Sequence, residues 1–236
     1  MIYKSKVYLW TLLLLPVLLL LPLKEVCAQA DKLIALKQSL DENKKRLRQY
    51  HWIETTIISL KGEEKSRIQK QCFYGPDGKV QKQQISASQP DMPGGLRGRI
   101  AKRKKEEISD YMKQAVALVH QYVPPDPLRM QKVKNAGNLS FTPSPSGPGT
   151  VRMDFRGYVK PGDLFSITVD TGSNSIQKVN VNTYLDYEKD AITVNANFTF
   201  LSNGISYPAN IVLVAPEKNV QVEVQNSNYQ TIGVAH

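Results

Sequence analysis

Cysteine is nearly absent from this chain of 236 residues, which has Cys27 and Cys72 as its two thiols. Cys27 lies in an N-terminal segment that we expect to be removed, so the mature chain keeps Cys72 alone and forms no internal disulfide. Cys72 lies in a stretch that alternates polar and apolar residues, where a small thiol packs like Ala or Val. We therefore expect a buried, inert Cys72 and a fold stabilised by core burial.

Histidine is almost as scarce, and the motifs of metal and nucleotide sites are missing. His51, His120 and His236 form no pair at metal-ligand spacing, and no cluster of cysteines or carboxylates completes a site. The chain also lacks a glycine-rich phosphate loop and the glycine pattern of a nucleophile elbow. We expect no metal and no cofactor.

Long apolar runs are confined to the N-terminus. Lys4 and Lys6 precede an apolar run at residues 9–23, and the small residues of Ala28-Gln29-Ala30 follow it. A positive start, a short apolar core and small residues before a cleavage point are typical of a secretory signal. Residues 1–30 are therefore predicted to be removed, and the product is predicted to be exported to the periplasm or secreted.

Beyond this segment no apolar run reaches the length of a membrane span, so residues 31–236 are predicted to form a single soluble domain. Acidic residues are outnumbered, since 31 Lys and Arg against 21 Asp and Glu give a net charge of +10. The mature chain keeps +8, because the segment to be removed carries three lysines and one glutamate. A positive chain favours anionic partners.

The positive charge is concentrated before the second predicted helix, in a cationic run that comprises Arg97, Arg99, Lys102, Arg103, Lys104 and Lys105. One interpretation is a patch that binds the anionic head groups of a membrane or an anionic glycan. Nucleic acid is not expected, because no interleaved aromatic residues supply stacking platforms. The other interpretation is a solvated, flexible loop whose charge is balanced by Glu106, Glu107 and Asp110 at the helix start.

Two segments have helical periodicity. In residues 31–48 the apolar stripe comprises Leu33, Leu36, Leu40 and Leu47. A second stripe comprises Ile108, Tyr111, Met112, Ala115, Leu118, Val119 and Tyr122. It ends before Pro124, because proline lacks the amide hydrogen and disfavours helical geometry in the preceding residue. Both helices are amphipathic and need an apolar surface to pack on.

Most of the remaining chain has the period of two that indicates strands. Strands are predicted at 52–60, 65–74, 79–86, 151–158, 165–169, 176–185, 191–200, 205–214 and 219–229. Residues 135–150 have the composition of a flexible loop, and Asn203-Gly204 predicts a two-residue hairpin turn. The order of elements predicts an α+β fold, mainly antiparallel β, in which two amphipathic helices cover an unclosed half-barrel or a strongly curved sheet.

Asp170-Thr171-Gly172 matches the active-site loop of an aspartic protease, with a carboxylate at the end of an apolar strand and a glycine for the turn. Such an enzyme needs two facing carboxylates, and because this chain has one Asp-Thr-Gly, a homodimer would be required. The same residues are typical of a plain hairpin turn. The turn and the protease stay open as alternatives for these residues.

In its order of elements the mature chain resembles the superfamily of periplasmic lipoprotein carriers, the LolA-like and LppX-like proteins. The resemblance covers the first helix, the strands from Trp52 to Ser86, the stripe from Ile108 to Tyr122 and the strands from Val151 to Tyr229. It implies an unclosed barrel whose concave apolar face is covered by helices and accepts acyl chains. No site residue is carried over from it, because it is a resemblance of architecture.

We therefore expect a monomeric, non-catalytic carrier or binding protein for lipid, acyl chains or lipoprotein in the cell envelope. The second helix would cover the cavity, and the cationic run would meet an anionic membrane surface. The alternatives are the homodimeric aspartic protease and a structural envelope protein without a ligand. A carrier requires a large apolar cavity, whereas a structural protein requires a filled core.

Overall fold

The computed structural model describes residues 21–88, 95–123, 125–144 and 147–233; residues 1–20, which carry most of the predicted signal, lie outside it. The strands are β1 (Tyr50–Leu60), β2 (Glu63–Tyr74), β3 (Val80–Ser88), β4 (Leu139–Pro143), β5 (Thr150–Arg156), β6 (Leu164–Asp170), β7 (Ser175–Tyr184), β8 (Ala191–Phe200), β9 (Ser206–Ala215) and β10 (Val220–Thr231). The helices are α1 (Leu21–Leu47), α2 (Gly95–Val119), α3 (Pro127–Asn135) and a 3-10 turn, η1 (Pro216–Lys218).

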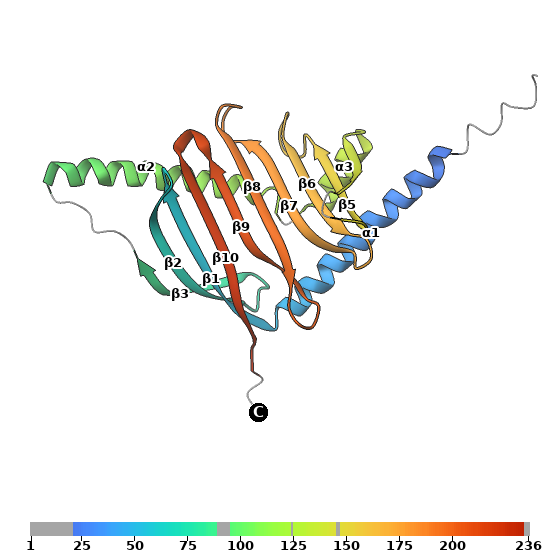
Figure 1. The fold of residues 1–236 in the computed structure, drawn as a ribbon, viewed down its shortest axis with the longest axis horizontal. Helices are drawn as coiled ribbons and strands as arrows, with labels where there is room; N and C mark the ends of the chain where they lie inside the picture. Colours follow the sequence, from blue (N-terminus) through green and yellow to red (C-terminus); the bar gives the residue numbers. More distant parts are fainter. Residues whose placement is uncertain (1–20, 89–94, 124, 145–146, 234–236) are drawn as a thin grey trace, which may run out of the picture.

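All ten strands belong to one antiparallel sheet, in the order β3-β2-β1-β10-β9-β8-β7-β6-β5-β4 (Figure 1). The sheet consists of two meanders, β1 to β3 and β4 to β10, and they join where β1 pairs with β10 along its whole length. It does not close, since β3 and β4 form its two edges. The predicted α+β class with an unclosed antiparallel sheet is confirmed.

Strand register places apolar side chains in rows on one face of the sheet, which we call the inner face. One row crosses nine strands and consists of Ile68, Thr56, Val224, Ile211, Ala196, Val179, Ile167, Met153 and Phe141. The next row consists of Ile58, Val222, Leu213, Val194, Val181, Phe165, Phe155 and Leu139. Neighbouring positions such as Thr168, Asn197 and Gln225 are polar and lie on the opposite face, as strand alternation requires.

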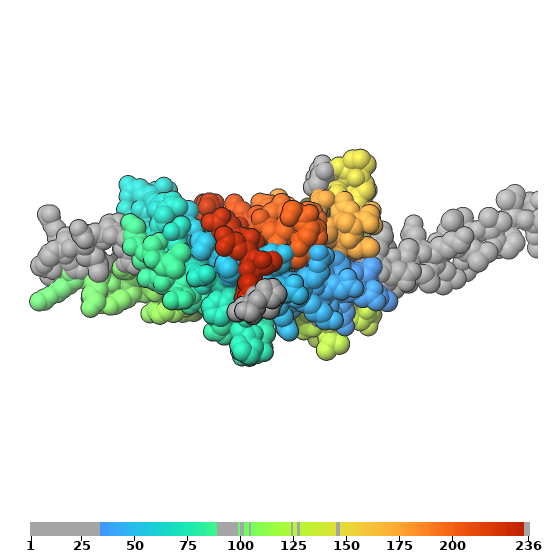
Figure 2. All heavy atoms as spheres, turned by 90° about the horizontal axis from the view of Figure 1, so that it is seen from below, coloured from blue at the N-terminus to red at the C-terminus, as the bar shows by residue number. Residues whose placement is uncertain are grey.

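The helices cover the inner face. Figures 1 and 2 show α1 and α2 on the same side of the sheet, and α3 lies near β5. Each helix contributes buried side chains to the core cluster: Leu36 from α1; Tyr111, Met112, Ala115 and Leu118 from α2; and Met130 and Val133 from α3. The stripe predicted for α2 is therefore the face that packs on the sheet, and in α1 the predicted residues Leu36 and Leu40 pack there.

Two buried tyrosine–aspartate hydrogen bonds fix the C-terminal part of α2 to the loops of the sheet. Tyr111 donates to Asp190 over 2.6 Å, and Tyr122, just beyond the helix, donates to Asp163 over 2.6 Å. Asp163 is 2% exposed and also accepts the backbone amides of residues 158–160. Burial and these acceptors raise the pKa of both tyrosines, so the phenols remain donors.

The predicted loop at the cationic run is wrong. These residues are the N-terminal part of α2, which is helical from Gly95, well before the apolar stripe begins at Ile108. Arginine and lysine are good helix formers, so the helix continues through charge that needs no packing partner. Similarly, α1 is helical from Leu21 and continues through the predicted cleavage point at Ala30.

The predicted loop at residues 135–150 is also wrong in part. It contains strand β4, and α3 precedes it, with Asp126 as N-cap and Pro127 at its first position. The turn at Asn203-Gly204 has three residues instead of two: Leu201 pairs with Ile205, and Gly204 has φ +79°. This is the geometry of a type I turn followed by a left-handed residue.

Cys72 is fully buried, as its alternating context predicts. Burial raises the pKa of its thiol to about 11, with a smaller contribution from the negative charge of Glu54. The reactive thiolate is therefore almost absent at neutral pH.

The anchor at the end of α2 can be tested with Tyr122→Phe, which removes the hydroxyl and leaves Asp163 without one of its donors. We expect urea denaturation to show a loss of about 1–2 kcal/mol in the free energy of unfolding. Tyr187→Phe is the matched control, because Tyr187 is 68% exposed and should change little. Equal effects of the two substitutions would contradict the anchor.

Candidate functional site

The inner face is covered unevenly along its rows. In one row Met153, Ile167 and Val179 are at most 2% exposed, whereas Val224 and Ile68 in the same row are half-buried and lie outside the core cluster. The row therefore extends from under the helices as it crosses β10, β1 and β2. We call the half-buried aliphatic residues on the inner face of these three strands the open face; they comprise Ile58, Leu60, Ile68, Val222 and Val224. Ile58, Leu60 and Val222 border the core cluster and pack against it, whereas Ile68 and Val224 do not.

The open face has a polar and aromatic end. Alternation along β1 places Glu54 and Trp52 on the same face as Ile58. Glu54 forms an ion pair with Lys82 of β3 at 2.6 Å, and its side chain is 12% exposed. Trp52 stacks on Tyr229 with ring centroids 5.4 Å apart. An apolar strip that ends in charged and aromatic groups suits a molecule with an apolar tail and a polar head.

The cationic run forms an arm. Figure 1 shows the N-terminal half of α2 extending past the edge of the sheet. The side chains of Arg99, Lys102, Arg103 and Lys105 are exposed, whereas those of Arg97 and Lys104 lie outside the described part of the chain. No acidic residue lies in the first turn of α2. The start of a helix carries a partial positive charge, which adds to the charge of these cations. Both are complementary to an external anionic surface.

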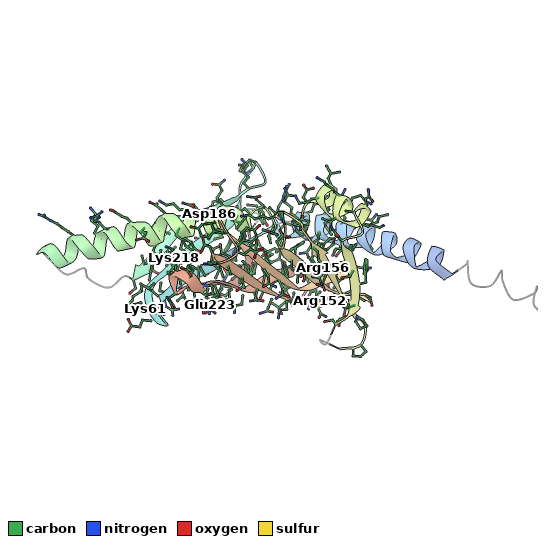
Figure 3. All side chains as sticks on the ribbon, turned by 90° about the horizontal axis from the view of Figure 1, so that it is seen from above. Lys61, Arg152, Arg156, Asp186, Lys218 and Glu223 are labelled. Atoms are coloured by element: carbon green, nitrogen blue, oxygen red, sulfur yellow. The ribbon has the colours of Figure 1, made fainter. Side chains whose placement is uncertain are left out.

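Two of the three acidic residues expected to balance the arm, Glu107 and Asp110, pair with other cations. Glu107 forms an ion pair with Lys218 at 3.5 Å, and Asp110 forms one with Lys113 at 2.8 Å. Figure 3 shows Lys218 and Asp186 beside α2, at the end of the sheet where Lys218 also lies 5.6 Å from the ring of Tyr111. These contacts belong to the anchored half of the helix.

The apolar stripe of α2 is used entirely in packing. Ala115 and Tyr122 are fully buried, and Ile108 and Val119 are half-buried against the core cluster. The stripe thus covers the closed part of the inner face. Its function as the cover of a ligand cavity stays a prediction.

Asp170 lies in the exposed hairpin turn between β6 and β7, where it pairs with Ser175. Its Oδ1 accepts the amides of Gly172 and Ser173, at 3.0 and 2.8 Å, and the hydroxyl of Ser173 at 3.0 Å. Asn174 completes the turn with φ 51°. The sequence 170–174 is therefore a turn closed by its own aspartate.

The electrostatics of Asp170 also differ from those of a protease dyad. The amide and hydroxyl of Ser173 lower the pKa of this carboxyl below its ordinary value. A facing carboxylate would raise one of the two pKa values instead. The arrangement in this chain stabilises an ionised carboxylate and supplies no proton to share.

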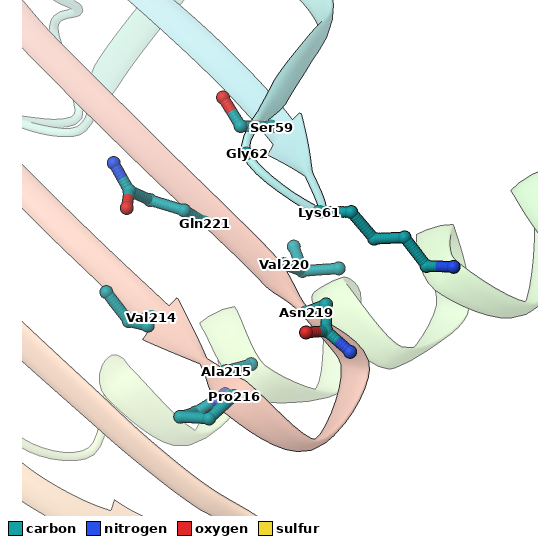
Figure 4. A pocket seen from close by; sticks show the side chains of 9 residues that line it. All are labelled: Ser59, Lys61, Gly62, Val214, Ala215, Pro216, Asn219, Val220 and Gln221. Atoms are coloured by element: carbon teal, nitrogen blue, oxygen red, sulfur yellow. The ribbon is translucent and has the colours of Figure 1, made fainter.

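Two hollows of moderate size are present. The first, of about 310 Å³, lies where the turn between β1 and β2 meets the loop between β9 and β10, and its lining includes Lys61, Asn219 and Val220 (Figure 4). The amide of Lys61 donates to the carbonyl of Asn219 at 2.8 Å, which joins the two turns. The second, of about 220 Å³, lies between α1 and the ends of β7 to β9. Neither of these two hollows is large enough to enclose a long acyl chain.

In the part of the chain that the structure describes, no helix is long and apolar enough to cross a membrane. Nor do any three His, Cys, Asp or Glu side chains in that part gather closely enough to hold a metal ion.

The open face was not identified from the sequence. Alternation in residues 66–74 and 220–225 does indicate one apolar side for each strand. The missing information was the pairing of β1 with β10, which brings Thr56 beside Val224 and makes one surface of two distant segments.

Comparison with known proteins leaves the family undefined. No family model matches the chain, and no curated protein matches it. A crystal structure of a DUF1329 family protein from Desulfovibrio piger is a distant structural neighbour, with a TM-score of 0.44 and 8% sequence identity; the match covers 89% of this chain and 95% of that one.

The turn at Asp170 can be tested by its pH dependence. Because the folded-state pKa is lowered, the carboxylate stabilises the fold above the unfolded pKa, and this contribution is lost as the pH falls through the folded value. Asp170→Ala should therefore lower the melting temperature at neutral pH and approach the wild type in strong acid. Asp170→Asn keeps an acceptor oxygen and should differ from the wild type less than Asp170→Ala does. A difference between Asp170→Ala and the wild type that stays constant down to strong acid would contradict this assignment.

Proposed function

We propose that this protein is an exported, non-catalytic carrier or binding protein for lipid acyl chains, free or attached to a lipoprotein, in the cell envelope. The single observation that carries the proposal is the open face, where apolar rows of the sheet extend beyond the helices that cover the rest. Half-buried apolar side chains on a concave sheet form a surface that gains free energy when a chain is laid on it. The resemblance in element order to periplasmic lipoprotein carriers supports the same function.

An acyl chain on the open face would contact Ile68 and Val224 and reach Ile58 near the edge of the core. Each methylene removed from water contributes about 0.8 kcal/mol. The head group would lie toward Glu54 and Lys82, where polar partners are present. Because Tyr111 and Tyr122 fix the C-terminal half of α2, the chain would enter on the side of the arm.

The arm supplies the attraction to membranes. Each Lys or Arg held near an anionic lipid surface contributes about 1 kcal/mol. With exposed cations on one projecting helix, the arm would bring the open face close to the lipids from which the cargo is taken. Added salt should strongly weaken binding to the membrane, since interactions between exposed charges are screened beyond about 10 Å at an ionic strength of about 0.1 M.

Cargo binding can be tested with a pair of neighbouring isoleucines. Ile58 and Ile57 are both half-buried on β1 and lie on opposite faces. Ile58→Thr should weaken binding of a fluorescent fatty acid about fivefold, because apolar contact is lost. Ile57→Thr should leave the affinity unchanged. Native mass spectrometry of the wild-type protein should also reveal co-purified lipid on a monomer.

Equal losses in the two variants would contradict binding at the open face. Fatty-acid binding no stronger than that of an unrelated basic protein would contradict the proposed function as a whole.

The arm can be tested with two triple variants that lose the same number of positive charges at different places. Replacing Arg99, Lys102 and Arg103 with Gln should reduce affinity for vesicles of phosphatidylcholine and phosphatidylserine about a hundredfold at low salt. The control replaces three exposed lysines of α1, Lys37, Lys44 and Lys45, with Gln. If co-sedimentation falls equally in both triple variants, net charge alone explains the attraction, and the arm has no special part in it.

A further inference from the structure

The second hollow is lined in part by the Asp-Thr-Gly-Ser stretch, through Ser173, and the proposed function gives this hollow no role. It has a volume of about 220 Å³ and lies under α1, between the β6–β7 turn and the β8–β9 turn. Ser173 and Ser175 form one side, Ser206 another, and α1 contributes Asn43 and Arg46. This position is separate from the open face, which is on strands β10, β1 and β2.

Asp170 sets the direction of a hydrogen-bond chain that leads to the hollow. Its ionised carboxylate only accepts, so the hydroxyl of Ser173 donates to it at 3.0 Å. The hydroxyl hydrogen of Ser173 is therefore directed at Asp170. In the contact of 2.6 Å between the hydroxyl oxygens of Ser173 and Ser175, Ser175 is then the donor. Ser175 is 7% exposed and lines the hollow. Its oxygen is therefore left as an acceptor, which suits a ligand that donates a hydrogen bond.

Ser206 provides a second polar group. It is 8% exposed, and its hydroxyl has no hydrogen-bond partner among the residues that the structure describes. The backbone groups of Ser206 already have a partner in Asn43. The Nδ2 of Asn43 donates to the carbonyl of Ser206, and the amide of Ser206 donates to the Oδ1 of Asn43 at 2.8 Å. A buried hydroxyl without a partner costs about 1–3 kcal/mol, so a group that pairs with it is favoured.

The rest of the lining restricts the class of ligand. Glu42 and Arg46 are its only charged residues, and their charges cancel. Arg46 donates to the carbonyl of Asn203 at 2.7 Å, which fixes it at the rim. Phe198 and Phe200 are alternate residues of β8 and supply apolar, aromatic surface. Serine hydroxyls, two aromatic rings and no net charge suit a ring that has a polar edge and a C–H face.

We propose that this hollow binds a small, neutral, polyhydroxylated molecule about the size of a monosaccharide, held by Ser175 and Ser206. The Asp170 turn is then a positioning element, which fixes the hydroxyl of Ser175 through Ser173. The inference does not rest on acyl-chain binding, since the two surfaces share no residue.

The experiment is an NMR titration of the isotopically labelled protein with D-glucose, and with cyclohexanol as a ring of similar shape that has a single hydroxyl. Glucose should shift the amides of residues 39–46, 173–176 and 198–206, and cyclohexanol should shift them much less. Ser206→Ala and Ser175→Ala should each weaken glucose binding about fivefold. Ser59→Ala is the matched control, because Ser59 is a half-buried serine that lines the first hollow.

Three results would overturn the inference: no glucose-dependent shift in these segments, equal binding of cyclohexanol, or an equal loss in Ser59→Ala. Displacement of glucose by octanoate would also overturn it, because the hollow would then be an acyl site. Fatty-acid binding that depends on Ile58 would be unaffected by any of these results, so the two proposals fail independently.

Discussion

The pleat of a single antiparallel sheet imposes the main constraint on this molecule. Alternation gives the sheet one apolar face that crosses nine strands, and that face must be removed from water. The three helices bury it from β5 to β9, where Phe155, Phe165 and Val181 are fully buried. Over β10, β1 and β2 the cover is incomplete. The core and the candidate ligand surface are therefore parts of one apolar face and differ only in what lies on them.

The anchoring of α2 divides the helix into two halves with different chemistry. Its C-terminal half carries the apolar stripe and is fixed by Tyr111 and Tyr122 through buried aspartates. Its N-terminal half carries cations and extends beyond the sheet. Because the C-terminal end of α2 is fixed, its N-terminal end is held at a defined position. The exposed cations of the arm, Arg99, Lys102, Arg103 and Lys105, are thus held beyond the edge of the sheet.

Most strands and both amphipathic helices were predictable, because burial of one face leaves a period in the sequence. The stripe from Ile108 to Leu118 and the alternation from Val220 to Val224 are examples. Local composition was misleading where charge or proline mimicked a loop, as in the cationic half of α2 and in β4, and α3 was not predicted. The open face and the serine hollow were not predictable, since each combines residues from strands distant in sequence. Asp170 had two local interpretations, and its partners in space favour the turn.

The pairing of the first strand with the last has a consequence for how the protein is made. β1 has β10 as its neighbour, and Tyr50 pairs with Thr231 close to the end of the chain. Contacts between residues so distant in sequence form slowly, because a long loop must be ordered before they are gained. Until the last strand is available, β1, β2 and β3 have no sheet to join and their apolar side stays in water. The first meander therefore completes its packing only after β10 has been synthesised.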